Sequence, residues 1–327
     1  MKKALVTGGS GLIGQFLLQQ LQVAGYEVIA LYRNTPPSHE AIGLKWVEGD
    51  VLDPLLLHSL VKEVEEVYHC AGFVSYSPQD ANVMQQINVE GTANIVDACL
   101  QFPEVKLCHV SSIAAINRKK GDSVITEEAK WDPNEERSVY AFSKYAAEVE
   151  VWRGISEGLK AVIVNPAIVL GPADWKRSST QLFKYAWDEH AFYTAGYANF
   201  VDVRDVVQAM TLLMQGDHWG RRFILNAHQI TYQEFFQRVA TCFTKKPPTI
   251  KVSNWLTEVI WRAEALRGKL IGSRPLITKE TARVAKEKHF YSNAKIKEAL
   301  GFEFRPLEDT LAWCCQSLQN RIEKAVA

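Results

Sequence analysis

The sequence predicts an α/β fold with a doubly wound parallel sheet, followed by a smaller, mostly helical C-terminal domain. Two observations predict the sheet. Short apolar runs alternate with segments of helical periodicity through the first half of the chain, which is typical of parallel strands joined by crossover helices. A glycine-rich loop, Thr7–Gly14, also stands between the first apolar run and the first helical segment, where phosphate-binding turns of this fold class occur.

The expected elements follow in order. Lys3-Ala4-Leu5-Val6 is a short apolar run and predicts the first strand. Apolar residues at positions 12, 13, 16, 17 and 21 then recur at helical spacing. Later strands are expected at residues 26–32, 44–48, 66–71, 105–110 and 161–164, with helices at 55–64, 88–100 and 139–157 between them.

Length and composition set the domain plan and the class of partner. At 327 residues the chain exceeds a typical single domain. We expect a dinucleotide domain at residues 1–172, to which 198–230 return, and a substrate domain at 173–197 and 231–327. The 37 basic and 37 acidic residues cancel, which gives no reason to expect nucleic acid as a partner.

Cysteine usage and hydropathy favour a cytoplasmic protein. The six cysteines form no CxxC pair and no disulfide-framework spacing, as expected in a reducing compartment. No apolar run approaches the length of a membrane-spanning helix. The eight histidines show no metal-ligand spacing, so no metal is expected. His69 and His109 are expected to be satisfied by neighbouring groups rather than catalytic.

The glycine loop is expected to bind the phosphates of a dinucleotide. Glycines at positions 8, 11 and 14 permit a tight turn, close approach of the backbone to a pyrophosphate, and close helix–strand packing. Free N–H groups and the helix dipole then face the phosphates. The predicted contacts from this loop are Thr7, Gly8, Ser10, Gly11, Leu12, Ile13 and Gly14.

The end of the second strand favours NADP(H) over NAD(H). An NAD site usually places a carboxylate there for the ribose hydroxyls, whereas Leu31-Tyr32-Arg33-Asn34 offers an arginine suited to a 2′-phosphate. A solvated surface arginine is the alternative interpretation. After the third strand, Asp50 in Gly49-Asp50-Val51 is placed to accept from the adenine amino group.

Acid–base chemistry is predicted at Tyr140-Ala141-Phe142-Ser143-Lys144. Tyr140 and Lys144 are four residues apart and share one helix face. A neighbouring ammonium lowers the pKa of a phenol, and the same lysine can hold the nicotinamide ribose. Ser112, at the end of the 105–110 strand, is predicted to polarise a substrate carbonyl, with Ser111 near the nicotinamide. The alternative for Tyr140 is a tyrosine that only packs in the core beside a surface lysine. The alternative for Ser111 and Ser112 is that they only form the turn at the end of the strand.

In combination these motifs resemble an extended short-chain dehydrogenase/reductase, of the NAD-dependent epimerase/dehydratase superfamily. The resemblance also rests on Asn88-Val89-Glu90-Gly91-Thr92, Asn165–Pro172, Phe200–Val207 and Tyr291–Ile296, and it spans nearly the whole chain. It implies a Rossmann-type fold and catalytic roles for Ser112, Tyr140 and Lys144. The cofactor contacts that it implies beyond the glycine loop and Arg33 are Asp50, Val51, Cys70, Ala71, Gly72, Ser111, Tyr140, Lys144, Pro166, Ala167, Ile168 and Val169.

Within that superfamily the chain is most similar to dihydroflavonol-reductase-like and steroid-dehydrogenase-like members. Dehydratases carry an Asp-Glu pair after the catalytic hydroxyl, where this chain has Ile113 and Ala114. The resemblance therefore implies an NADP(H)-dependent enzyme that interconverts a carbonyl and an alcohol, with Tyr140 as proton donor. An NDP-sugar epimerase with tightly bound NAD and a non-catalytic NADP(H) sensor remain alternatives. A homodimer through the two helices at 88–100 and 139–157 is also implied by resemblance.

The remaining third of the chain is expected to form the substrate side. Eight aromatic residues lie between Trp175 and Phe200; they suit an apolar or ring-shaped substrate or, alternatively, an ordinary core. Lys176, Arg177 and Lys184 leave a phosphate-bearing substrate open. An apolar helical stripe runs from Trp255 to Leu266 and is expected to pack on the small domain. The charged loop from Asn117 to Arg137 is placed to cover the substrate.

Overall fold

The structure is a computed structural model that describes residues 1–34, 42–117, 124–132, 134–135, 137–175, 179–252 and 289–326. Its centre is a seven-stranded sheet in which every neighbouring pair of strands is parallel. In spatial order the strands are β11 (Arg221–Leu225), β7 (Lys160–Pro166), β5 (Lys106–Val110), β4 (Glu66–His69), β1 (Lys3–Thr7), β2 (Glu27–Tyr32) and β3 (Leu44–Glu48). The strand order reverses between β1 and β4.

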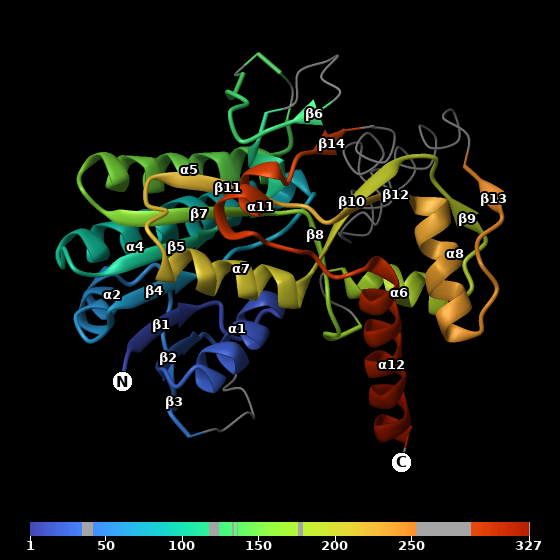
Figure 1. The fold of residues 1–327 in the computed structure, drawn as a ribbon, viewed down its shortest axis with the longest axis horizontal. Coiled ribbons are helices and arrows are strands. Elements are labelled where there is room, and N and C mark those ends of the chain that lie inside the picture. The colour runs from blue at the N-terminus through green and yellow to red at the C-terminus, as the bar shows by residue number, and fades with distance from the viewer. Residues whose placement is uncertain are drawn as a thin grey trace.

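Helices cover both faces of this sheet, which confirms the doubly wound Rossmann-type fold (Figure 1). One face packs against α1 (Leu12–Val23), α7 (Val203–Gln215) and α11 (Ala294–Leu300). The other packs against α2 (Pro54–Val61), α4 (Gly91–Leu100) and α5 (Val139–Ser156). The inner strands are therefore buried on both sides, as the near-continuous apolar runs predict, whereas the edge strand β3 contains no fully buried residue.

The expected helix at 88–100 begins earlier and less regularly than the sequence suggests. The chain enters it through a 3-10 turn at Pro78–Asp80, α3 (Ala81–Met84) and a π-helical turn at Gln85–Glu90. Within that turn, the Asn88 side chain accepts a hydrogen bond from Phe73 N (2.7 Å) and donates one to Phe73 O (2.9 Å). These tertiary contacts hold the helix start against the segment that follows β4.

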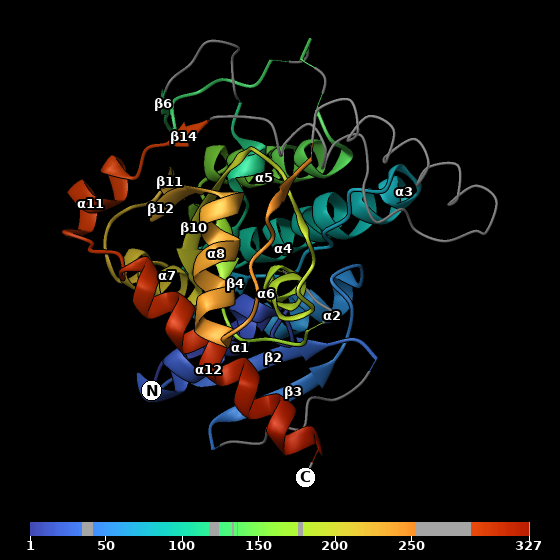
Figure 2. The same ribbon diagram turned by 90° about the vertical axis from the view of Figure 1, so that its right-hand side faces the viewer.

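The C-terminal region is mostly helical and lies beyond the carboxyl ends of the central strands (Figures 1 and 2). Its described helices are α6 (Thr180–Trp187), α8 (Tyr232–Phe243) and α12 (Leu307–Val326). The short strands form three small sheets: β8 (Ile168–Leu170), β10 (Tyr197–Asp202) and β12 (His228–Thr231); β9 (Phe192–Tyr193) and β13 (Ile250–Lys251); β6 (Val124–Ile125) and β14 (Phe290–Tyr291). A 3-10 turn, Ile113–Ala115, follows β5.

The aromatic residues between 175 and 200 mainly build the core of this region. Phe183 and Phe200 are fully buried and pack on Phe235, at 5.8 and 4.6 Å between ring centroids. Trp175 and Trp187 pack against the same cluster. The core interpretation is thus favoured over a wall of substrate contacts. Lys176, Arg177 and the 255–266 stripe lie outside the described residues.

Segment 198–230 is divided between the two parts of the fold. Its β11 joins the central sheet and α7 packs on that sheet, whereas β10 pairs with β8 and β12. The assignment of domains stays a prediction. Among the described residues no helix is long and apolar enough to cross a membrane.

Candidate active site

The glycine loop lies at the reversal of strand order between β1 and β4, where ligands of doubly wound sheets bind. Gly8 has a φ of +69°, and a Cβ there would lie 2.6 Å from Ala71 N. A Cβ on Gly14 would lie 2.2 Å from Gly8 O. The N-cap of α1 is Gly11, which has no side chain to cap the first N–H groups of the helix. The loop is therefore a backbone cradle with N–H groups open to an anion, which fits a dinucleotide pyrophosphate.

The ends of β1 and β4 are fastened together by buried side chains. Thr7 Oγ1 and His69 Nδ1 share a hydrogen bond of 2.7 Å, and Ala71 N donates to Thr7 Oγ1 at 3.2 Å. His69 Nε2 shares another bond of 3.0 Å with Thr92 Oγ1. Burial, with the Lys144 charge, lowers the pKa of His69 to about 3, so this imidazole is neutral and holds the crevice in shape.

Ser112, Tyr140 and Lys144 converge at the same edge of the sheet. Ser112 follows β5, and its Oγ accepts from Ala114 N at 3.1 Å and hydrogen-bonds with Tyr140. Tyr140 and Lys144 project from α5, where Lys144 Nζ donates to Val110 O at 2.8 Å. The structure thus brings the three predicted catalytic side chains together.

Burial dominates the electrostatics of Tyr140 and Lys144. It raises the pKa of Tyr140 above its ordinary value, with Tyr76 adding to the rise, while the hydrogen bond with Ser112 lowers it. This direction is opposite to the lowering expected from Lys144, because the ammonium is directed to Val110 O. Burial also lowers the pKa of Lys144 to about 8, against the opposing effect of the Glu148 carboxylate. Tyr140 is consequently a protonated phenol at neutral pH.

Tyr76 is a feature of the site that the sequence pattern did not reveal. It lies in the segment after β4, with its ring edge-on to Tyr140 at 5.9 Å between centroids, and it remains 44% exposed. It also faces Tyr232 at the start of α8: burial, followed by Tyr76, raises the pKa of Tyr232 to about 12. Tyr76 therefore lies near both Tyr140, the predicted proton donor, and the start of α8. In the sequence it stands directly before Ser77-Pro78 and belongs to no motif.

The predicted contacts for the adenosine end lie after β2 and β3. Arg33 is 53% exposed, and its Nη1 lies 3.7 Å from Asp50 Oδ2. Val51 is buried and packs against Gly91, where a Cβ would lie 2.6 Å from Val51 Cγ2. Arg33 is thus at the expected edge, in a loose ion pair that an incoming phosphate can replace.

The other predicted contacts lie at or after the carboxyl ends of β1, β4, β5 and β7. Ser111 is buried and donates to Glu148 Oε1 at 2.5 Å. Cys70, Ala71 and Gly72 follow β4, and a Cβ on Gly72 would lie 3.7 Å from Lys144 Nζ. Pro166 ends β7, and Ala167, Ile168 and Val169 lead into and form β8. In the glycine loop, Ser10 is exposed, and Leu12 and Ile13 are half-buried in the first turn of α1.

His109 departs from the expectation that its neighbours satisfy it. It is fully buried beside His69, at 5.3 Å between ring centroids, and neither ring nitrogen has a hydrogen-bond partner among the described residues. Burial, followed by Lys144 and His69, holds its pKa well below the ordinary value. The imidazole is neutral because a charged ring would be uncompensated there. The described residues include no group of three metal-ligating side chains.

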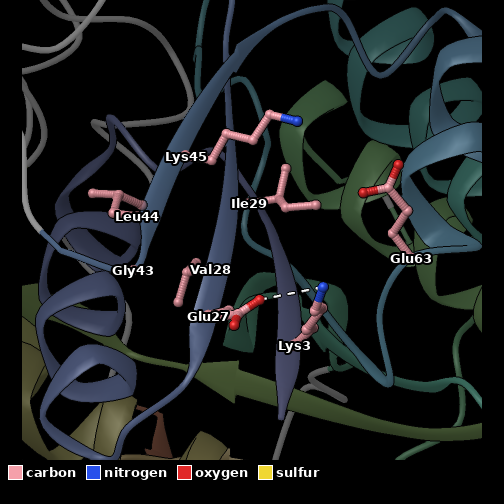
Figure 3. Close-up of a pocket in the computed structure, with 8 residues that line it drawn as sticks. All are labelled: Lys3, Glu27, Val28, Ile29, Gly43, Leu44, Lys45 and Glu63. Atoms are coloured by element: carbon pink, nitrogen blue, oxygen red, sulfur yellow. Dashed lines mark ion pairs between the residues drawn. The ribbon is translucent and has the colours of Figure 1, made fainter. Parts of the chain in front are cut away.

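A cavity of about 350 Å³ lies away from this crevice (Figure 3). Its lining includes Lys3, Glu27 and Leu44, the first residues of β1, β2 and β3. Lys3 Nζ lies 3.2 Å from Glu27 Oε2. Because the strands are parallel, these residues mark the amino-terminal edge of the sheet, opposite to the glycine loop, so this cavity is no part of the candidate site.

The fold and the site together define a nucleotide-dependent enzyme of the doubly wound α/β class. The chain belongs to the NAD dependent epimerase/dehydratase family, whose model matches residues 4–225. It is accordingly an oxidoreductase of the extended short-chain dehydrogenase/reductase type, as the motifs indicate.

Similar proteins agree with this membership. A Synechocystis sp. protein that provisionally bears the name dihydroflavonol 4-reductase is 30% identical over 326 residues, covering 96% of this chain and 94% of its own. Cinnamoyl-CoA reductase 1 of Petunia hybrida is 25% identical, covering 97% of this chain and 92% of its own. The crystal structure of gox2253 superimposes with a TM-score of 0.83 and 29% sequence identity, and the match covers 98% of this chain and 99% of that one.

Proposed function

We propose that the chain is an NADP(H)-dependent oxidoreductase that interconverts a carbonyl and an alcohol on a small apolar or aromatic substrate. The observation that carries the proposal is the convergence of Ser112, Tyr140 and Lys144 beside the glycine cradle. The reductase names of two similar proteins support the direction and the apolar substrate.

The residues suit reduction of a carbonyl. A bound nicotinamide would supply the hydride to the carbonyl carbon. Ser112 Oγ is placed to hydrogen-bond the substrate oxygen, and the protonated Tyr140 is placed to give that oxygen its proton. Lys144 lies beside Gly72 at the carboxyl end of β4, where its ammonium would hold the nicotinamide ribose.

Cofactor titration tests the proposal. NADPH and NADH are titrated by nicotinamide fluorescence on wild type, on Arg33→Ala, and on Arg221→Ala as a control arginine at the far end of β11. We expect NADPH to bind more tightly than NADH. Arg33→Ala should weaken only NADPH, by about tenfold or more, because it removes one charge-assisted phosphate contact.

Turnover assays then distinguish a reductase from the two alternatives, an NDP-sugar epimerase and a non-catalytic NADP(H) sensor. Aryl aldehydes and ketones are offered with NADPH, and loss of the reduced nicotinamide is followed. Consumption of NADPH in step with alcohol formation supports the reductase. Preference for NADH, no effect of Arg33→Ala, and conversion of sugar nucleotides without net use of cofactor would together favour the epimerase. Binding of NADPH without turnover of either class would favour the sensor.

A further inference from the structure

Glu148 lies on the helix face that carries the candidate proton donor. It follows Tyr140 by eight residues and Lys144 by four on α5, so the three side chains lie along one face. Its side chain is only 1% exposed. A buried carboxylate is costly unless hydrogen bonds and an opposite charge compensate it, so its partners indicate its purpose.

Three donors from three different strands converge on this carboxylate. Ser111 Oγ and Asn165 Nδ2 each donate to Glu148 Oε1 at 2.5 Å, and Arg222 Nη1 donates to Oε2 at 3.1 Å. Ser111 follows β5, Asn165 lies on β7 and Arg222 on β11, the three strands at one side of the sheet. Glu148 therefore joins the catalytic helix to the edge at which Ser112 stands.

The same network clamps the backbone of Ser112. Asn165 Nδ2 also donates to Ser112 O at 3.0 Å, and Ser111 N donates to Val164 O at 2.8 Å. We propose that Glu148 is a positioning residue for the reaction: through Ser111 and Asn165 it fixes the backbone that presents Ser112 to the substrate, and it places a negative charge one helical turn from Lys144. This inference rests on the proposed function.

Arg222 extends the network to the segment between Ser112 and Tyr140. Its Nε donates to Glu127 O at 2.8 Å and its Nη2 to Ala129 O at 3.0 Å. Glu127 Oε1 in turn accepts from Ile224 N at 2.9 Å. The arginine thus neutralises Glu148 and fastens the segment at 127–129 to β11 at the same time.

The groups around Lys144 leave Glu148 as the source of negative charge. His69, His109 and Cys70 face the ammonium from β4, β5 and the end of β4. Burial keeps both imidazoles neutral and raises the pKa of the Cys70 thiol to about 12. The Glu148 carboxylate is therefore the neighbour that raises the pKa of Lys144 against burial.

The test compares Glu148→Gln with Glu150→Gln, a matched control on the same helix. Glu150 is partly exposed and pairs with Arg153 Nε at 2.9 Å on the surface. Glutamine has one accepting oxygen for the three donors, and its NH₂ leaves at least one of them unpaired. We expect kcat with a reducible probe aldehyde to fall about 100-fold in Glu148→Gln, with NADPH Kd at pH 7 changed less than about threefold.

A pH profile separates positioning from simple damage to the fold. NADPH Kd is measured from about pH 6 to about pH 10, across the range in which Lys144 titrates. NADPH affinity should fall with rising pH as Lys144 loses its proton; we call this part of the profile the alkaline limb. In Glu148→Gln the alkaline limb should move to lower pH by about one unit. Glu148→Asp, which keeps the charge, should return the limb toward the wild-type position. Glu150→Gln should leave both kcat and the limb unchanged.

Two further variants keep the inference falsifiable. If urea titration shows that Glu148→Gln is not folded, the double variant Glu148→Gln/Arg222→Met takes its place, because it removes both buried charges. In the double variant the loss of NADPH affinity should still begin at a lower pH than in the wild type. Asn165→Ala should lower kcat without moving the limb. A folded Glu148→Gln with wild-type kcat and limb would overturn the inference. Absence of turnover in the wild type would instead count against the proposed function. The pH dependence of NADPH Kd would still test the effect of Glu148 on Lys144.

Discussion

At the residue scale, the chemistry depends on where one proton resides. Burial and Tyr76 keep the Tyr140 phenol protonated, and Ser112 orients it through a hydrogen bond. A donor of this kind serves reduction at neutral pH, when a substrate oxygen gains negative charge and the phenol lies within hydrogen-bond reach. For the proposed reductase, a protonated Tyr140 suits the direction from carbonyl to alcohol.

Removal of the Tyr140 hydroxyl should greatly lower kcat and leave NADPH binding intact. Tyr140→Phe keeps the ring that packs against Tyr76 and deletes only the hydroxyl. We expect kcat to fall by about 10²-fold to 10⁴-fold, the usual contribution of a positioned acid, with NADPH Kd nearly unchanged. Fluorescence titration and steady-state rates measure the two quantities. Equal loss of binding and of rate would contradict the role of Tyr140 as proton donor.

Lys144 makes stability depend on pH. Burial lowers its pKa from 10.5 to about 8, so between these values the unfolded chain binds more protons and stability rises with pH. Relative to Lys144→Met, the wild-type free energy of unfolding should increase by up to about 3 kcal/mol from pH 8 to pH 10.5. Urea unfolding of both proteins at each pH cancels the other titrating groups. A constant difference across this window would show that the ammonium is not desolvated.

At the element scale, the glycine loop sets how closely the cofactor can approach. Gly14→Ala would place a Cβ 2.2 Å from Gly8 O, whereas Gly11→Ala would place one 3.2 Å from the same oxygen. Gly14→Ala should therefore displace the turn, cost about 1–3 kcal/mol of stability and weaken NADPH binding strongly. Gly11→Ala, the matched variant, should do much less. Similar effects of both variants on Kd would argue against the cradle geometry.

The sequence predicted the bounds of those helices and strands that depend on the local pattern of apolar residues. The strand at 44–48 agrees with β3, and the helix at 139–157 agrees with α5 to one residue. The helix at 55–64 ends sooner, at Val61, because Val64 N instead bonds Val61 O in a turn before β4. Such turns depend on the packing of the following strand, which periodicity does not report.

Side-chain roles that depend on tertiary neighbours could not be predicted. Spacing placed Tyr140 and Lys144 on one helix face, and the end of a predicted strand marked Ser112. Tyr76 belongs to no motif, and its meaning comes only from the ring opposite it. The aromatic residues at 175–200 were ambiguous because a core and a ligand pocket select the same apolar side chains.

At the scale of the whole molecule, buried polar contacts join the C-terminal helix α12 and the segment before it to α7 and β10. Asp205 on α7 is buried, pairs with Arg305 and accepts from Arg305 N at 2.9 Å. Asp202, at the end of β10, accepts from Thr310 Oγ1 on α12 at 2.8 Å. These contacts hold the start of α12 against β10 and against α7, which packs on the central sheet.

The expected homodimer would use the outer side of α5, the helix that carries Tyr140 and Lys144. Phe142 and Val149 are 52% and 43% exposed on α5, seven residues apart and so on one face. A second copy of this helix would cover both side chains, which large apolar residues on a surface favour. Because Tyr140 and Lys144 project from the same helix, such an interface would also restrain the catalytic face.

Sedimentation velocity tests this interface. The wild type should sediment as a dimer at about 10 μM, an affinity expected of a standard interface, and Phe142→Glu/Val149→Glu should sediment as a monomer because two carboxylates would be buried at the contact. Leu55→Glu is the matched control: Leu55 is 83% exposed on α2, outside the expected interface, and the variant should remain a dimer. A monomeric wild type, or a double variant that still dimerises, would exclude α5 as the interface and leave its rigidity to Glu148 and the strands beneath it.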